Sequence, residues 1–373
     1  MWYEKFGFEG NPYQKLDPFK IELSRLSWNR SDLASERQKL DRFVADVLSG
    51  SRVGLIGYGA IGSGKTWLAR ILQKEVQTKQ GNMIFIYTKV HKLEPTFAVI
   101  YKIAIESILS QMDMVKKTVS TKTGKDDLEG WKQVIGDEDL AKGLANITVG
   151  GKNGAIAERW LLGNRVSSGD LDALGIINPL DSDYKQYEML KNAIFALSRL
   201  FPVVLFVIDE LDNAPVKLAS ALSDSLRNML DEFASNFALV CLFTAEALEE
   251  WYEHGYSEAL QRRIDYTVTL GNLKTEVVPE FLRAHHSLYR KKDAEVRDQL
   301  FPFSEDAVVT ILKSMPIEKH FPGYFFPNCE TIAKIAVEEK VEPVDSEYVQ
   351  RKRSRMPYQY TTETYSLDDF PKK

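Results

Sequence analysis

The sequence contains few cysteines and lacks long apolar runs. Cys241 and Cys329 are its only cysteines in 373 residues, far apart and each in an apolar stretch. Neither a disulfide framework nor a paired-cysteine metal site can be built from them, which fits a reducing compartment. The longest apolar run, 202-PVVLFVI-208, is far too short to cross a bilayer. The N-terminus, MWYEKFGFEGNPYQKLD, lacks the apolar core of a secretory signal. We therefore expect a soluble cytoplasmic protein without membrane association.

A strong excess of either charge is also missing. The formal net charge is −5, which argues against a large and uniformly basic face. Local basic stretches remain, such as 351-RKRSR-355. Hydrophobic residues make up 44% of the chain and charged residues 27%, which is ordinary for a soluble globular protein. The length is sufficient for two or three domains.

Strand-like and helix-like segments alternate over most of the first 270 residues. The strand-like runs are almost continuously apolar, as is typical of a parallel sheet that is covered on both faces. We therefore expect an α/β fold of the P-loop NTPase type, with helices on both faces of the sheet. The expected strands are 52–57, 82–88, 203–208, 237–244 and 266–270, and the expected helices are 31–50, 65–77, 95–112, 217–235 and 246–262.

Two regions depart from this alternation. Residues 113–185 are rich in Gly, Ser, Thr and charge, and they predict an insertion that is partly loop, with a short helix at 156–163. After residue 271 the strand pattern stops, and helical periodicity at 275–291, 304–315 and 328–340 predicts a small all-α domain. The expected organisation is an N-terminal segment that packs on the core (1–50), a P-loop core (51–270), a helical lid (271–340) and a tail (341–373).

The segment 59-GAIGSGKTW-67 matches G-x-x-x-x-G-K-[ST] and lies between an expected strand and an expected helix. A triphosphate is a dense anion, and glycines let backbone N–H groups point at it without a Cβ in the way. Lys65 would contact the β- and γ-phosphates, and the Thr66 hydroxyl would ligate Mg²⁺. An accidental glycine-rich turn is disfavoured by this context. The candidate ATP-binding residues are Gly59, Ala60, Ile61, Gly62, Ser63, Gly64, Lys65, Thr66 and Trp67.

Two acids follow the most strand-like run of the chain. Asp209 is a candidate magnesium ligand, and Glu210 is a candidate catalytic residue that polarises the attacking water. Adjacent acids after a fully apolar strand are costly unless they have a function. The alternative is a helix N-cap or an exposed loop pair. Glu210 favours hydrolysis of ATP over its use by a kinase, since kinases must exclude water.

Three further residues are catalytic candidates. Thr244, at the end of a strand, would sense the γ-phosphate; alternatively, it caps the following segment. Arg262 and Arg263 lie just before the last strand, and either guanidinium is a candidate arginine finger toward the γ-phosphate of a neighbouring subunit. Alternatively, these arginines complement the dipole at a helix end.

The order of these parts resembles that of the AAA+ ATPases, in particular the initiator and origin-recognition-like branch and the transposition-regulator ATPases. The resemblance rests on GAIGSGKT, on VLFVIDE, on Thr244 in the sensor 1 position, on QRRI before the last strand and on the helical lid. The opening FGFEGNPY and WNRSDLASERQKLDRFV look like the N-terminal segment of the family, which packs near the adenine. This likeness implies that Tyr13 and Arg30 lie in the adenine region.

The sequence also differs from the family in several places. The lid lacks the sensor 2 arginine, and Phe326 stands in its place. The 113–185 insertion looks like segments of P-loop ATPases from phage-defence or mobile-element systems. The residues after 341 are too few for the winged helix of initiators, which makes an origin-binding initiator the less favoured reading.

The resemblance implies an ATPase that uses ATP and Mg²⁺, forms homo-oligomers, and regulates or recruits protein partners in a DNA transaction such as transposition, defence or replication. Direct contact with DNA is left open. The alternative is a nucleotide-controlled switch or scaffold that does not bind DNA. A small-molecule kinase is disfavoured by Glu210 and by the lid.

Overall fold

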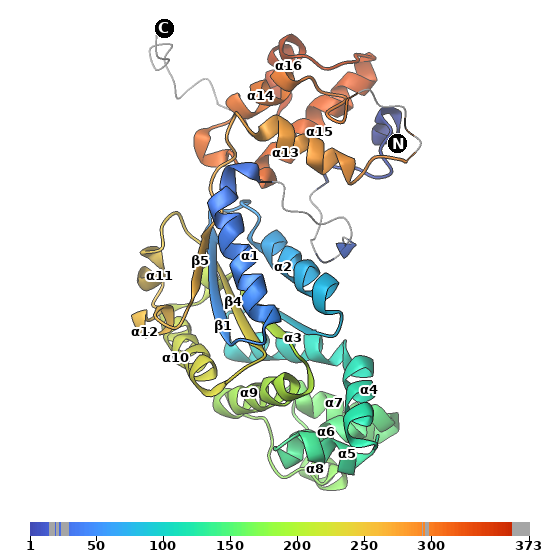
Figure 1. Cartoon of the computed structure of the whole chain (residues 1–373), viewed down its shortest axis with the longest axis vertical. Coiled ribbons are helices and arrows are strands. Elements are labelled where there is room, and N and C mark those ends of the chain that lie inside the picture. Colours follow the sequence, from blue (N-terminus) through green and yellow to red (C-terminus); the bar gives the residue numbers. More distant parts are fainter. Residues whose placement is uncertain (15–18, 20–21, 24–29, 293, 295–297, 360–373) are drawn as a thin grey trace. The chain divides into compact units, whose positions relative to one another are not determined.

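The computed structural model describes all residues except 15–18, 20–21, 24–29, 293, 295–297 and 360–373 (Figure 1). The chain divides into two compact units. The sheet unit comprises Gln38–Gly59 and Leu72–Thr269, and the helical unit comprises Met1–Arg37, Ala60–Ile71 and Leu270–Lys373. Part of the expected N-terminal segment and the end of the expected tail therefore lie outside the described residues.

The sheet unit contains a five-stranded sheet in the order β2-β3-β4-β1-β5, in which every pair of neighbours is parallel. Every residue of the interior strand β3 is buried, as expected for a parallel sheet covered on both faces. The predicted α/β fold is confirmed, and all five strands fall where the apolar runs indicated. Their bounds are β1 Val53–Gly59, β2 Ile84–Lys89, β3 Val204–Asp209, β4 Phe237–Thr244 and β5 Tyr266–Thr269.

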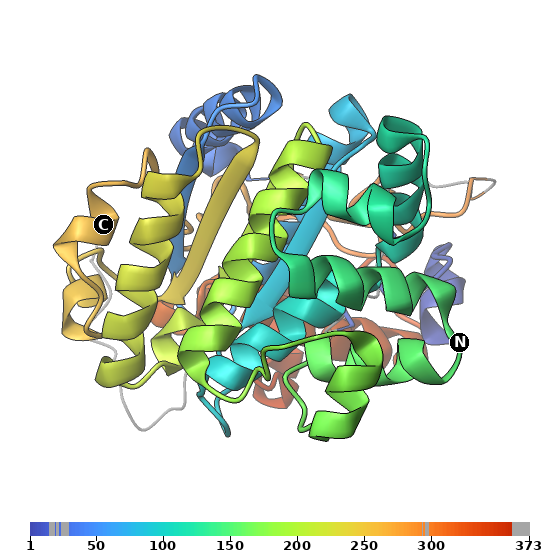
Figure 2. The ribbon, with the colours of Figure 1, turned by 90° about the horizontal axis from the view of Figure 1, so that it is seen from below.

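Helices follow the strands, and Figure 2 shows α9 and α10 lying over the strands. The single helix expected at 246–262 is wrong, because the chain forms two short helices separated at Gly255. This glycine has φ +90°, and a Cβ there would lie 2.8 Å from Val216 Cγ1. Helix α9 was not predicted. The helices here are α1 Ala34–Leu48, α2 Lys65–Gln80, α3 Phe97–Leu109, α9 Asp183–Leu200, α10 Val216–Glu232, α11 Glu250–Glu253 and α12 Glu258–Gln261, with a 3₁₀ turn at Leu211–Asn213.

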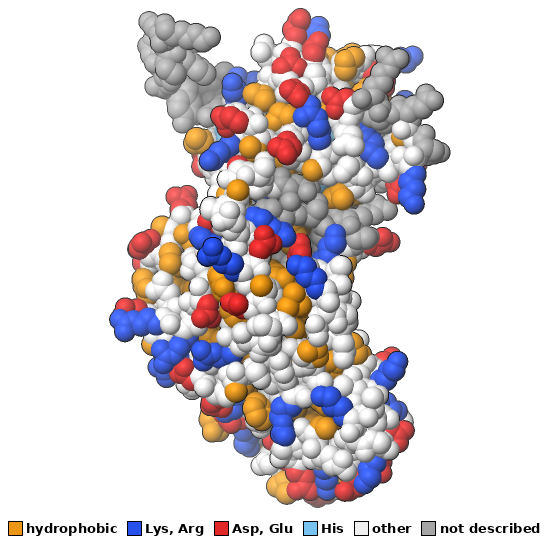
Figure 3. Space-filling view, viewed as in Figure 1, with side chains coloured by type: hydrophobic (Ala, Val, Ile, Leu, Met, Phe, Trp, Pro, Cys, Tyr) orange, Lys and Arg blue, Asp and Glu red, His pale blue; other side chains and the backbone are white. Residues whose placement is uncertain are grey.

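The insertion is partly loop, as expected, at 162–167 and 175–182, but more of it is helical than its composition indicated, and the short helix expected at 156–163 is part of a longer one, 151–161. Two of its glycines end helices: Gly124 and Gly175 are left-handed C-caps with φ of 71° and 67°. Its small polar residues start helices, as Asp137 does by accepting a bond from the Leu140 N–H. Basic and acidic side chains are interspersed over these helices on the face seen in Figure 3. The helices are α4 Met112–Thr123, α5 Leu128–Val134, α6 Glu138–Val149, α7 Gly151–Leu161 and α8 Ser168–Leu174.

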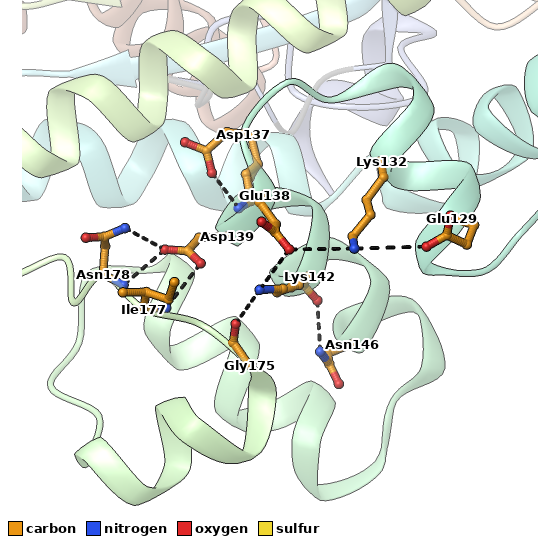
Figure 4. Close-up of polar contacts among 11 residues, drawn as sticks. Glu129, Lys132, Asp137, Glu138, Asp139, Lys142, Asn146, Gly175, Ile177 and Asn178 are labelled. Carbon is orange, nitrogen blue, oxygen red and sulfur yellow. Dashed lines mark hydrogen bonds and ion pairs between the residues drawn. The ribbon is translucent and has the colours of Figure 1, made fainter.

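A polar network fastens the segment after α8 to helix α6 (Figure 4). The buried Asp139 carboxylate accepts bonds from the backbone N–H groups of Ile177 (3.1 Å) and Asn178 (3.0 Å), and from the Asn178 side-chain amide (2.8 Å). One turn away, Lys142 Nζ donates to the Gly175 carbonyl at 2.6 Å. These bonds compensate for burying a charge and explain how a polar, glycine-rich stretch becomes ordered.

The helical unit has an apolar core of its own, built from N-terminal residues and from residues between Leu273 and Met356. The segment expected as a tail from 341 begins inside this core: Val344, Tyr348 and Val349 are buried, and α16 packs on α14. The helices are α13 Val278–Ser287, α14 Glu305–Lys313, α15 Pro322–Glu339 and α16 Ser346–Lys352, with 3₁₀ turns at Trp2–Phe6, Ser31–Leu33, Ile317–Lys319 and Arg353–Arg355.

Both cysteines are buried and free, and burial raises the pKa of the Cys241 thiol to about 12. This thiol is therefore protonated and unreactive near neutral pH. Within the described residues, no helix combines the length and the apolar character needed to cross a membrane.

Candidate functional site

The phosphate loop is the turn between β1 and α2. Gly62 and Gly64 have φ of +82° and +106°, which only glycine adopts without strain. The backbone N–H of Ser63 donates to the Ala60 carbonyl at 3.1 Å, and Lys65 Nζ donates to the same oxygen at 3.0 Å. Helix α2 begins at Lys65, so Thr66 and Trp67 lie in its first turn. The helix start, the lysine and the positive-φ glycines therefore adjoin one another, as a phosphate site requires.

The phosphate loop contains a side-chain hydroxyl that can form a hydrogen bond with a ligand. The Ser63 hydroxyl is buried and has no hydrogen-bond partner among the described residues, and a buried hydroxyl without a partner costs free energy. Ile61 is 66% exposed, an unusual place for a large apolar side chain. Gly59 ends β1 and pairs in register with Thr244 of β4. The residues present thus fit the phosphates of a nucleotide.

The acids lie at the carboxyl end of β3. Asp209 is 1% exposed, and its carboxylate accepts bonds from the Tyr87 hydroxyl (3.0 Å) and from the Glu210 backbone N–H (2.8 Å). Glu210 has φ 56° and ψ 37°, the left-handed conformation that costs a non-glycine residue roughly 1–2 kcal/mol. Such strain in a non-glycine residue is typical of functional sites.

The Glu210 carboxylate is held from two sides. The Asn213 side-chain amide donates to Oε2 at 3.2 Å, and Lys89 Nζ lies 3.7 Å from Oε1. Lys89 ends β2 and pairs in register with Asp209, which explains its position beside the acids. We call Tyr87, Lys89, Asp209, Glu210 and Asn213 the strand-end site. Glu210 keeps 42% of its side chain exposed, so water reaches it.

Thr244 ends β4, the strand next to β3. Its backbone N–H donates to the Asp212 carboxylate at 2.8 Å. Thr244 does not cap a helix, because α11 starts only at Glu250, whose own carboxylate bonds the backbone N–H groups of Glu246 and Ala247. β1, β4 and β3 are parallel neighbours, so Gly59, Thr244 and Asp209 all lie at one edge of the sheet.

Arg262 and Arg263 follow α12 and are engaged within the chain. Arg262 pairs with Glu258 at 2.6 Å and is 69% exposed, while Arg263 pairs with Asp231 at 2.7 Å and is 43% exposed. The bond from Arg263 lowers the pKa of the Asp231 carboxyl below its ordinary value. Exposed pairs of this kind contribute little to stability, so either arginine is available to another partner at small cost.

Tyr13 and Arg30 lie in the helical unit. The Tyr13 ring is fully buried, and its hydroxyl lies 2.6 Å from His286 Nε2. The guanidinium of Arg30 donates to the carbonyls of Gly271 and Asn272 at 2.9 Å each and pairs with Asp32 at 2.7 Å. These bonds fasten the N-terminal segment to the start of the helical region. Their role near an adenine stays a prediction.

Tyr13 belongs to an aromatic–histidine cluster, made up of Trp2, Tyr13, Phe281, His285, His286 and Phe326. Phe326 stacks on His285 with ring centroids 4.3 Å apart and on Phe281 at 5.7 Å. Burial lowers the pKa of His285 to about 4 and that of His286 well below its ordinary value, so both rings are neutral at pH 7. Phe326 is therefore partly buried and packs against the core of the helical unit.

Sequence reasoning missed Tyr87, Lys89 and Asn213. The signal that could have identified Lys89 is its place at the end of a predicted strand, since parallel strands that neighbour β3 must end beside the acids. Among the described residues, no group of three or more His, Cys, Asp or Glu could hold a metal ion by itself. Magnesium binding by Thr66 and Asp209 stays a prediction, and Mg²⁺ usually keeps several waters and is held by one or two carboxylates with substrate phosphates.

Comparisons with known proteins show the fold. No protein-family model matches the sequence, and no curated protein matches it significantly. Among solved structures, the Aeropyrum pernix ORC2 protein (ADPNP-ADP complexes) is similar, with a TM-score of 0.53 and 11% identity over 93% of this chain and 72% of that chain. Pyrobaculum aerophilum Cdc6p (TM-score 0.49, 12% identity, 91% and 73% covered) and the Thermotoga maritima RuvB branch migration motor (0.43, 13%, 88% and 72%) are more distant. The chain thus has an α/β P-loop fold with a helical domain, like that of the ORC2 protein.

Proposed function

We propose that this chain binds ATP with Mg²⁺ and hydrolyses it. The observation that carries the proposal is Glu210, a strained and water-accessible acid directly after a fully buried strand that ends in a buried aspartate. A polar arrangement that costs stability persists where it has a function. The ORC2 protein of similar fold was solved with ADPNP and ADP, which supports a nucleotide as the ligand.

Each residue of the site has a role in this proposal. Lys65 and the backbone N–H groups of the loop bind the phosphates, while Thr66 and Asp209 hold Mg²⁺. Glu210 accepts the proton of the attacking water, and Thr244 orients that water or contacts the γ-phosphate. Mg²⁺, when bound, neutralises part of the phosphate charge. Lys89 and Asn213 position the Glu210 carboxylate through the contacts described above.

Glu210→Gln tests the catalytic role. We expect kcat to fall about 100-fold or more, because general-base catalysis is lost, while ATP binding is kept. Lys65→Ala should instead weaken ATP binding about tenfold or more, since a charge-assisted bond to phosphate is removed. The measurements are steady-state phosphate release and equilibrium binding of a labelled nucleotide. Glu253→Gln, the same change at an exposed position of α11, is the control. A normal hydrolysis rate in Glu210→Gln would show that the site assignment is wrong.

We further propose that the protein acts as a homo-oligomer that regulates or recruits a protein partner in a DNA transaction such as transposition, defence or replication. The exposed, weakly held Arg262 and Arg263 support an intersubunit role. Mixing either alanine variant with Lys65→Ala protein should restore part of the activity if a finger from one subunit completes the site of the next. No recovery with either variant would favour the structural role of these arginines.

DNA binding is the less supported half of this proposal, and a second function competes with it. In the lid, Phe326 packs against aromatic rings where the family carries an arginine, which favours a nucleotide-controlled switch or scaffold. ATP-dependent DNA binding that weakens steeply with salt would support the first function. ATP-dependent assembly that DNA does not alter would support the second.

A further inference from the structure

Helix α15 and the phosphate loop meet backbone to backbone at Gly323 and Gly62 (α15 is labelled in Figure 1). The N–H of Gly323, the second residue of the helix, donates to the Gly62 carbonyl at 3.1 Å. A Cβ added at Gly323 would lie 2.8 Å from Gly62 Cα, a separation that real Cβ atoms do not show. Only glycine at position 323 therefore permits this approach. The first turn of α15 carries no charged side chain, so the contact is not an ion pair.

This bond fixes a peptide plane inside the phosphate loop. The carbonyl of Gly62 and the N–H of Ser63 belong to one rigid peptide unit and point in opposite directions. Gly323 holds the carbonyl end, and the Ala60 carbonyl accepts from the N–H end. Helix α15 thereby restrains the orientation of a backbone N–H in the loop that is proposed to bind phosphate.

The contact continues to the C-terminal segment. The Tyr324 ring comes within 3.5 Å of a Cβ built on Gly62. The same ring meets Tyr358 edge-on, with centroids 5.0 Å apart. Tyr358 is held by the fully buried Asn328, whose side-chain amide donates to the Tyr358 carbonyl (2.6 Å) and accepts from its N–H (3.0 Å). Tyr324 thus neighbours both Gly62 and Tyr358.

We propose that Gly323 is a positioning residue for the phosphate loop, and that Tyr358 supports it through Tyr324. Nucleotide affinity then depends on the positions of α15 and of the C-terminal segment. No arginine of the lid is needed for this effect. This inference rests on the proposed nucleotide binding. The Gly62–Gly323 bond holds the loop in the conformation that accepts phosphate before the nucleotide binds. Without that bond, the loop becomes ordered only on binding, and the free-energy cost of this ordering lowers the affinity.

The test compares Gly323→Ala with Gly169→Ala in the full-length chain. Gly169 is also the second residue of a helix, α8, but a Cβ there would meet nothing within 4 Å. We expect Gly323→Ala to bind a labelled, non-hydrolysable ATP analogue about five- to tenfold more weakly than the wild type, as for the loss of one hydrogen bond. Gly169→Ala should bind within about twofold of the wild type. The thermal unfolding midpoints without nucleotide should be alike in the two variants, which separates positioning from general destabilisation.

Tyr358→Ala and Tyr358→Phe provide a second arm that needs no change in α15. Loss of the aromatic contact should weaken binding about threefold in Tyr358→Ala, and Tyr358→Phe, which keeps the ring, should restore it. Equal or tighter binding by Gly323→Ala would overturn the inference while leaving the proposed function intact. If Gly323→Ala does not fold, the tyrosine pair decides alone, and equal binding by Tyr358→Ala overturns the inference. Absence of nucleotide binding by the wild type would overturn the proposed function, and the inference with it.

Discussion

The strand-end site and the aromatic–histidine cluster differ in the exposure of their polar side chains. In the strand-end site, Glu210 and Lys89 keep 42% and 38% of their side chains exposed and carry charges that face each other. In the cluster, the side chains of Tyr13 and His286 are completely buried. Burial raises the pKa of Tyr13 and lowers the pKa of His286, so the neutral form of each is favoured. Strong pKa shifts therefore mark the packed core in this protein. The candidate catalytic acid is recognised by its backbone strain and its access to water.

Acidification should produce the largest difference in stability between the two regions. His285 would take up a proton near its ordinary pKa of 6.5 in the unfolded chain, but only near 4 in the folded unit. Between these values the unfolded state binds more protons, so stability is fully present above pH 6.5 and falls as the pH drops toward 4. His286 acts in the same direction. The loss should reach a few kcal/mol for the helical unit.

Hydrogen exchange measured from pH 7 to pH 4 and corrected for the intrinsic rate checks this expectation. Amides of α13, which carries both histidines, should lose protection before those of β3. A His285→Phe variant, which cannot be protonated at this position, should show a smaller loss. Equal protection of α13 at both pH values would contradict the neutral, buried state of the two rings.

Removal of the Tyr13 hydroxyl from the aromatic–histidine cluster should have a smaller effect on stability. His286 Nδ1 faces the Gln299 carbonyl at 3.2 Å and must donate its proton there, so Nε2 accepts from the Tyr13 hydroxyl at 2.6 Å. Tyr13→Phe leaves this nitrogen buried without a partner and should cost about 1–3 kcal/mol in the free energy of unfolding. Chemical denaturation measures it.

Tyr348→Phe is the control for this deletion. Its hydroxyl bonds Glu339, a carboxylate that is 41% exposed and that also pairs with Lys352. Water can replace that bond, so the loss should stay below that of Tyr13→Phe. Equal losses in the two variants would show that enclosure of the Tyr13–His286 pair has no energetic weight.

Relief of the backbone strain at Glu210 should have the smallest effect on stability. Glu210→Gly should raise the free energy of unfolding by about 1 kcal/mol while abolishing turnover, since glycine adopts φ 56° freely. Lys340, with φ 58° at the end of α15, provides the comparison in the helical unit. Lys340→Gly should give a similar gain without loss of turnover. A destabilised Glu210→Gly protein would mean that the contacts of Glu210 with Asn213 and Lys89 outweigh its strain.

The strands and the phosphate loop could be read from the sequence because their signals are local. Continuous apolar runs predicted β1 to β5, and glycine spacing predicted the loop where φ is positive. The insertion could not be read in this way. Its glycines and small polar residues look like loop composition, yet Gly124 and Gly175 end helices and Asp137 starts one. Composition alone does not tell a helix boundary from a loop.

Other features depended on long-range packing. The break at Gly255 is set by its approach to Val216, and Tyr13 meets His286 and Phe326 although they lie 273 and 313 residues further along the chain. Lys89 was missed for the same reason, because it becomes a neighbour of Glu210 only through the pairing of β2 with β3. The contact of Gly323 with Gly62 has no sequence signal beyond two glycines.

The left-handed backbone of Glu210 also bears on the history of this position. Glycine and asparagine adopt that conformation at lower cost, so mutation without selection for turnover would drift toward them. A lineage that gave up hydrolysis but kept nucleotide binding should therefore lose this glutamate early, while its lysine and glycines in the loop persist. Homologues that carry Gly or Asn at position 210 would be expected to act by binding nucleotide rather than by consuming it.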